Sequence, residues 1–97
     1  MVAVDRQRID KWLWHARFVR TRSDAAALAE AGFVRVNGKR IAAAGRLVRV
    51  GDVLTVALDR SVRVVVVEDF SERRGASHAA RTLYRDLTAR ETDSRED

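Results

Sequence analysis

The sequence contains no cysteine, which excludes disulfide bonds, thiolate zinc sites, iron–sulfur clusters and cysteine nucleophiles. Histidine is almost as scarce, because the chain has only His15 and His78, which are far apart in the sequence. A metal centre would therefore depend on carboxylates, and no paired spacing of Asp and Glu suggests one. We expect a protein without a metal or any other cofactor.

Long apolar runs are also absent. No stretch reaches the roughly 18 apolar residues that a membrane span requires. Residues 1–8 do not contain the apolar stretch of a signal peptide. We expect a cytoplasmic protein with no membrane partner.

Catalytic motifs are missing as well. No nucleophile is accompanied by a base, no glycine-rich loop is suited to a phosphate, and Ser77 next to His78 does not make a triad. A chain of 97 residues has a small core, with little room for both a deep cleft and the scaffold to hold it. We predict that the protein is not an enzyme and has no small-molecule substrate.

What the sequence has in excess is positive charge. Its 19 Lys and Arg residues against 14 Asp and Glu give a net charge of +5. Residues 1–48 hold ten basic and four acidic residues, a net charge of +6, whereas residues 49–97 hold nine basic and ten acidic residues, a net charge of −1. All the basic residues except Lys11 and Lys39 are arginine, whose planar guanidinium can form two hydrogen bonds with a phosphate. Both a nucleic-acid binder and a soluble protein that is merely rich in arginine fit this composition.

The first predicted helix starts at Arg8. Apolar residues recur at helical spacing from Ile9 to Val19 and form one stripe. Trp14 and Phe18 fall nearly opposite that stripe, so the helix must contact two neighbours. We expect both rings to pack against the sheet or a C-terminal helix, with stacking on nucleic-acid bases as the alternative. We expect both histidines on the surface.

A second helix follows after a very short link. Thr21 and Asp24 have the spacing of a capping box, and Ser23 is an alternative N-cap. The run 25–31 consists mainly of alanine, a strong helix former, and Gly32 stands where a left-handed residue ends a helix. These signals predict a helical hairpin.

The hydrophobic period then changes from helical spacing to alternation, which predicts strands. Asn37-Gly38 predicts a tight hairpin turn, because both central positions of such a turn require a positive φ. The expected strands are residues 33–36, 39–41, 47–50, 53–58 and 62–67. A second amphipathic stripe predicts a C-terminal helix from about Ser77 to Arg90. The expected elements, a helical hairpin followed by short strands and a C-terminal helix, place the chain in the α+β class.

Several of these segments, taken in order, resemble a known family. They are Arg8 to Trp14, Arg17, Thr21-Arg22-Ser23, Gly32 to Lys39, and Val50-Gly51-Asp52. Together they are similar to the S-four domain, the RNA-binding domain named after small-subunit ribosomal protein four. The Trp12-Leu13-Trp14 run and the stretch from Glu72 to Tyr84 further resemble the small stand-alone, heat-shock-induced, ribosome-associated proteins of that family.

The resemblance implies a fold and a function. The implied fold is the alpha-L motif, a helical hairpin packed on a small antiparallel sheet, and the implied function is binding of structured ribosomal RNA. The subfamily implies free large ribosomal subunits that carry peptidyl-tRNA as the partner, and a role in recycling stalled translation, with transfer RNA as a further contact. We expect a monomer. The alternatives are a general binder or chaperone of structured RNA, and a protein-interaction adaptor that uses the C-terminal helix.

The resemblance also divides the chain. We expect a flexible N-terminus over residues 1–7 and the S-four-type domain over residues 8–58. An extension of the same domain follows over residues 59–90, and a disordered tail over residues 91–97.

The predicted RNA-binding residues form two groups, one near the helical hairpin and one around the Asn-Gly turn. We expect their cationic and polar side chains to converge on one surface that contacts phosphates and 2′-hydroxyls. Thr21 and Ser23 are helix caps first, and Asp10 is expected to pair with a nearby arginine rather than to bind RNA. The predicted residues are Arg8, Lys11, Arg17, Arg20, Thr21, Arg22, Ser23, Arg35, Asn37, Gly38, Lys39 and Arg40.

Overall fold

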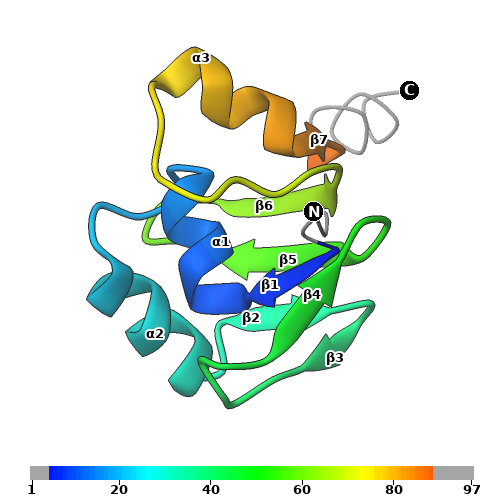
Figure 1. Cartoon of the computed structure of the whole chain (residues 1–97). Coiled ribbons are helices and arrows are strands. Elements are labelled where there is room, and N and C mark those ends of the chain that lie inside the picture. The colour runs from blue at the N-terminus through cyan, green and yellow to red at the C-terminus, as the bar shows by residue number, and fades with distance from the viewer. Residues whose placement is uncertain (1–4, 89–97) are drawn as a thin grey trace.

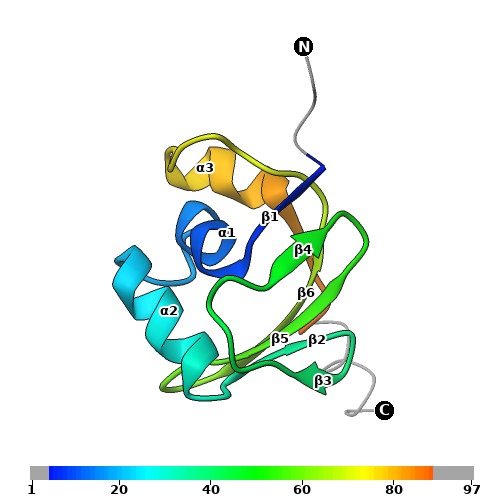
Figure 2. The ribbon, with the colours of Figure 1, turned by 60° about the horizontal axis from the view of Figure 1, so that its bottom comes forward.

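The computed structural model describes residues 5–88 and confirms the α+β class. All helices described lie on one side of a five-stranded antiparallel sheet (Figures 1 and 2). The elements are β1 (Arg6–Arg8), α1 (Ile9–His15), α2 (Arg22–Glu30), β2 (Val34–Val36), β3 (Lys39–Arg40), β4 (Leu47–Arg49), β5 (Val53–Ala57), β6 (Val62–Val67), α3 (Ser77–Ala80), the 3-10 turn η1 (Arg81–Leu83) and β7 (Tyr84–Asp86).

The helical hairpin forms from the signals that predicted it. The Thr21 hydroxyl caps α2 by accepting a hydrogen bond from the Asp24 backbone N–H at 3.0 Å. Gly32, with a φ of +85°, ends α2, and its N–H and that of Phe33 bond back to carbonyls of the last turn. The first helix ends earlier than predicted, at His15, because Arg17 takes the same left-handed position with a φ of 64°.

The strands follow the order β3-β2-β5-β6-β7 in the main sheet, while β1 and β4 pair in a separate two-stranded ribbon. The Asn37-Gly38 turn between β2 and β3 has positive φ at both positions, 52° and 85°, as its sequence predicts. Alternation in β2 buries Val34 and Val36 and leaves Arg35 exposed. At β2 one sheet face therefore packs on the helices, and the other faces solvent.

The core joins the helices to that inner face. Trp12, Ile9 and Leu13 of α1 are fully buried with the inward valines of β2, β5 and β6. Phe18 packs on the sheet as predicted, with its ring 4.8 Å from that of Tyr84. Trp14 has a different neighbour, since the Arg74 guanidinium lies 5.8 Å from the centre of its ring.

The N-terminal segment differs from the prediction. Arg6 and Gln7, expected in a flexible segment, form β1 with Arg8. The Gln7 side chain is buried and donates to the carbonyl of Ser71 at 2.9 Å. A strand of three residues depends on a partner far along the chain, here β4, which local periodicity does not reveal. Residues 1–4 lie outside the described residues.

The C-terminal helix is present but shorter than predicted. It covers Ser77–Ala80, and after η1 the chain continues as β7, which pairs with β6. The edge of β6 offers backbone partners that a continued helix would leave unpaired, and Tyr84 is a good strand former. Residues 81–86 of the predicted helix form η1 and β7 instead. Residues 89 and 90 of that helix, and the predicted tail over 91–97, lie outside the described residues.

The surface placement of His15 is wrong. The side chain is 1% exposed, and its Nδ1–H donates to the Ser71 carbonyl at 3.0 Å. His78 is exposed, as expected.

Candidate nucleic-acid interface

The start of the helical hairpin gathers charge around one buried carboxylate. Asp10, 3% exposed, lies in the first turn of α1. Its carboxylate pairs with Arg8 at 3.0 Å and with Arg22, the first residue of α2, at 3.7 Å. This confirms that Asp10 pairs with arginine. It also fixes two predicted RNA-binding residues side by side, with about half of each side chain exposed.

The surroundings of His15 carry more positive charge. Burial is the largest effect on the imidazole and lowers the pKa of His15, while the hydrogen bond to Ser71 opposes that shift. The positive charges of Lys11, Arg22 and Arg74 lower the pKa of His15 further. These three cations therefore lie within electrostatic range of one point beside the hairpin.

The β1–β4 ribbon adds arginines that sequence reasoning missed. Arg6 of β1 lies directly opposite Arg49 of β4, and both side chains are exposed. Like charges at directly opposed positions destabilise a sheet. Neither arginine has an ion pair within residues 5–88. The alternation in Arg6-Gln7-Arg8 was the available signal, since it places both arginines on one face of a strand.

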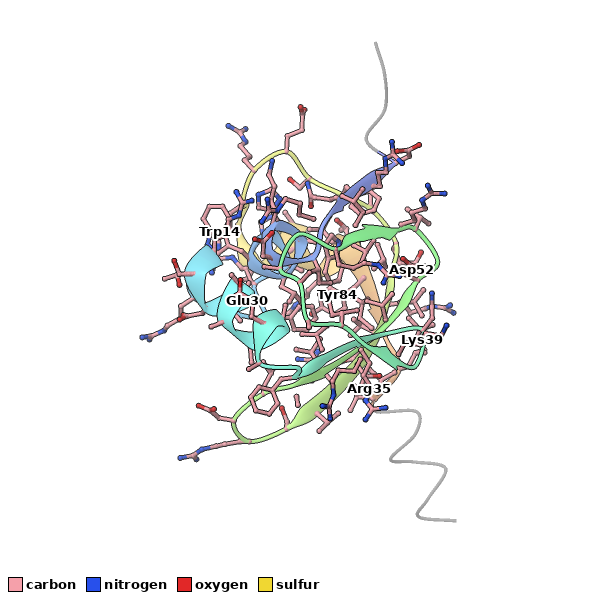
Figure 3. The ribbon with its side chains drawn as sticks, turned by 90° about the horizontal axis from the view of Figure 1, so that it is seen from below. Trp14, Glu30, Arg35, Lys39, Asp52 and Tyr84 are labelled. Carbon is pink, nitrogen blue, oxygen red and sulfur yellow. The ribbon has the colours of Figure 1, made fainter. Side chains whose placement is uncertain are left out.

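The Asn-Gly turn is tied to the end of that ribbon. The Asn37 side chain donates to the Asp52 carboxylate at 3.1 Å and accepts from the Val53 N–H at 2.9 Å. The other Asp52 oxygen accepts from the Arg49 N–H at 2.9 Å. Figure 3 shows Lys39 and Asp52 on the same side of the molecule. Asn37 is therefore occupied in holding the turn, and Lys39 projects beside the ribbon.

These contacts connect the two predicted groups through the ribbon rather than directly. Asp10 links the hairpin to Arg8, the ribbon carries Arg6 and Arg49, and Asn37 with Asp52 links Arg49 to the turn. We call the resulting series of exposed cations the cationic track. It comprises Arg22, Arg8, Arg6, Arg49 and Lys39.

The remaining predicted residues near the hairpin have other neighbours. The Arg17 side chain donates to the Gly75 carbonyl at 2.9 Å. Arg20 borders a groove of about 800 Å³ between α2 and the β5–β6 turn. Thr21 caps α2, and Ser23 is exposed in its first turn.

The residues around the turn divide between two surfaces. Gly38 is exposed, and a Cβ built there would meet no atom within 4 Å, so a ligand can approach this backbone closely. Arg35 and Arg40 lie directly opposite each other on β2 and β3, on the outer face of the main sheet.

Within residues 5–88, no three His, Asp or Glu side chains are grouped so that they could hold a metal ion. No helix in this part of the chain is long and apolar enough to cross a membrane.

Comparison with known proteins identifies relatives over most of the chain. The S4 domain family matches residues 7–54. Heat shock protein 15 of Escherichia coli is 37% identical over 89 residues, which cover 92% of this chain and 65% of that protein. A Heat shock protein 15 homolog of Haemophilus influenzae is 39% identical over 82 residues, or 81% of this chain and 60% of that protein.

A solved structure shares the fold as well as the sequence. The structure of Vibrio cholerae Heat Shock Protein 15, described as trimeric, matches with a TM-score of 0.80 and 34% identity. The match covers 95% of this chain and 96% of that one. The chain spans less than two thirds of the length of the curated relatives compared above.

Proposed function

This chain belongs to the S4 domain family, among the small members related to Heat shock protein 15, and from that membership we propose that it binds structured RNA on the ribosome. The S4 domain is the S-four domain that the sequence resembles. Binding of RNA accounts for the exposed arginines better than composition alone. Arg6 and Arg49 lie directly opposite each other on the ribbon, where two like charges lower stability when no anion lies between them.

The observation that carries the proposal is the directly opposed pair Arg6 and Arg49 at the centre of the cationic track. Two guanidinium groups on one ribbon face, with no carboxylate partner in the described part of the chain, suit a phosphate between them. A duplex of RNA presents phosphates and 2′-hydroxyls rather than readable base edges in its deep groove. A rigid track of cations therefore suits recognition of shape.

The partner that we propose is ribosomal RNA of free large subunits carrying peptidyl-tRNA, with a role in recycling stalled translation. Support comes from the residues that resemble the ribosome-associated subfamily, and the similarity to Heat shock protein 15 supports membership of a small heat-shock branch of the S4 domain family. Binding by a monomer in the cytoplasm is part of the same proposal. Transfer RNA is a further partner that this subunit would present.

We propose no catalytic role. The residues of the cationic track are arginines and a lysine without an adjacent nucleophile and base, and their chemistry is that of phosphate binding.

Charge reversal on the track tests RNA binding. Lys39→Glu and Arg49→Glu should each weaken affinity for a ribosomal RNA hairpin about tenfold, because each change removes a phosphate contact and adds repulsion. Arg60→Glu in the exposed β5–β6 turn is the matched control, with the same change of charge and little expected effect. Fluorescence anisotropy gives the affinities, and the thermal midpoints should stay close to that of the parent. Equal loss in all three variants would mean that only net charge matters.

Sedimentation of a lysate tests the ribosomal partner. The protein should migrate with free large subunits, and Arg49→Glu should move it to the top of the gradient. Migration with polysomes, or with no ribosomal particle in the parent, would exclude the recycling role. A general RNA chaperone would spread over all RNA-containing fractions. A protein adaptor would keep its position in the gradient when Arg49 is changed to Glu.

A further inference from the structure

The outer face of the main sheet is a second surface with charge and no assigned role. Within the described residues it is not covered by a helix, because the helices lie on the opposite side (Figures 1 and 3). By strand alternation, its positions hold Arg35 on β2, Arg40 on β3, and Val53, Thr55 and Ala57 on β5. The outer positions of β6 are Val62, Val64 and Val66, and that of β7 is Arg85, so the described strands place no carboxylate on this face.

Two arginines on this face oppose each other as directly as those of the ribbon. Arg35 and Arg40 are Cα partners in the β2–β3 register, and both side chains are exposed. Neither has an ion pair in the described part of the chain. Figure 3 shows Arg35 directed away from the body of the molecule. The pair thus holds two positive charges together with no ion-pair partner in the described residues, whereas Arg85 on the same face pairs with Glu68 at 3.4 Å, and this arrangement suits a bound phosphate.

An exposed aromatic ring lies next to this pair. Phe33 directly precedes β2, two residues before Arg35, and 53% of its surface is exposed. A Cβ built on the neighbouring Gly32 would lie 3.1 Å from Cδ of Arg40, so the Arg40 stem runs across the backbone beside Phe33. By strand alternation Phe33 and Arg35 therefore project to the same side of the sheet, and the Arg40 stem lies beside Gly32, the residue before Phe33.

A purely structural role explains only part of Phe33. Its N–H bonds to the Leu28 carbonyl at the end of α2, and both residues border the 800 Å³ groove, which is the apolar contact that often accompanies this helix ending. Leucine or valine would make that contact with less exposed apolar area. The exposed half of the Phe33 surface is not accounted for by packing.

We propose that Phe33, Arg35 and Arg40 form a binding site for an unpaired nucleotide of RNA. The base stacks on the Phe33 ring, and the adjoining phosphate lies between the two guanidinium groups. This rests on the proposed RNA-binding function and extends it, because the cationic track takes a duplex while the outer face takes the single strand that leaves it. Aromatic stacking of bases, combined with cations that contact the backbone, is a recurrent physical basis of single-strand binding.

Binding of a labelled oligouridylate of about eight nucleotides tests the site. Phe33→Leu should weaken this binding about tenfold or more, because leucine keeps the apolar contact with Leu28 but has no ring face. Phe33→Tyr should bind like the parent, and Arg35→Gln should bind less tightly. All three variants should retain the parent's affinity for an RNA hairpin with no unpaired ends and its thermal midpoint.

The outcomes separate this inference from the proposed function. Binding of the hairpin but not of oligouridylate by the parent, or equal oligouridylate binding by Phe33→Leu, overturns the nucleotide site alone. Oligouridylate binding that depends on Phe33 without hairpin binding supports the site and contradicts the duplex proposal. Analytical ultracentrifugation without RNA tests whether a second copy of the chain, and not a nucleotide, binds this face. Self-association that Phe33→Leu abolishes would overturn the nucleotide site.

Discussion

At the scale of single residues, Asp10 shows how one side chain serves both the fold and the surface. Its carboxylate is buried, while the two arginines that it pairs with are about half exposed. It also accepts a hydrogen bond from the Lys11 N–H at 2.7 Å. The carboxylate therefore fixes the first turn of α1, the last residue of β1 and the first residue of α2 in relation to each other.

Asp10→Asn should lower the free energy of unfolding by about 1–2 kcal/mol, less than for a fully buried pair because solvent screens the arginines. Asp24→Asn, at an exposed first-turn position of α2, is the control and should change stability by no more than about 0.5 kcal/mol. Urea titration measures both. RNA affinity should not fall in Asp10→Asn, since a negative charge beside the track is removed. Unchanged stability would show that the carboxylate has no structural role.

His15 should make stability depend on pH. Burial lowers the pKa of His15, so the unfolded chain takes up this proton more readily than the folded protein does. The contribution of neutral His15 to the free energy of unfolding is therefore fully present above the ordinary histidine pKa of about 6.5, and it is lost as the pH falls below that value. Thermal midpoints between about pH 7.5 and about pH 5.5 should fall in the parent and in His78→Gln, and should fall less in His15→Gln. An identical decline in all three proteins would assign it to other groups.

Sequence reasoning reached Asp10 and not His15, and the difference is physical. Asp10 lies in the first turn of a helix with Arg8 two residues before it, so a pair between its carboxylate and an arginine can be expected from neighbouring residues alone. A histidine is amphipathic, and its burial depends on the Ser71 carbonyl, which lies 56 residues away in the chain. No local pattern contains that partner.

At the scale of elements, those that depend on local signals were predicted and those that depend on distant partners were not. A few adjacent residues determine each of three local features, namely the Thr21 cap, the end of α2 at Gly32 and the Asn37-Gly38 turn. The strands β1 and β7 have three residues each and exist because β4 and β6 offer edges. The candidate site follows the same rule, since the arginine of β4 joins the track only through its pairing with β1.

Two of the three left-handed glycines in the described residues allow a matched comparison. Gly32 and Gly38 both have a φ of +85°, so alanine at either position should cost about 1–2 kcal/mol of stability through backbone strain. Only at Gly32 would the new Cβ meet Arg40, at 3.1 Å from its Cδ. Gly32→Ala should therefore weaken oligouridylate binding as well, whereas Gly38→Ala should not. Urea titration and anisotropy distinguish the two effects, and an alanine that is tolerated without cost at Gly38 would argue against strain at the turn.

At the scale of the whole molecule, one-sided packing leaves two cationic surfaces. The cationic track runs along the ribbon and the start of the hairpin, and the outer face of the sheet carries Arg35 and Arg40. Of the ten basic residues in 1–48, six lie on these two surfaces: Arg6, Arg8, Arg22 and Lys39 on the track, and Arg35 and Arg40 on the outer face. Binding that uses such surfaces releases counterions from RNA, so its strength is set by salt.

The salt dependence counts the phosphates that the protein contacts. Five cations on the track predict about four to five neutralised phosphates, so log K for the RNA hairpin should fall against log salt with a slope of about −3 to −5. Arg49→Glu should reduce the slope by about 1, because one phosphate contact is lost. Phe33→Leu should leave the slope for the hairpin unchanged, since stacking releases no counterion from the duplex. A slope near zero for the parent would show that the arginines of the track do not contact phosphate, whatever the affinity.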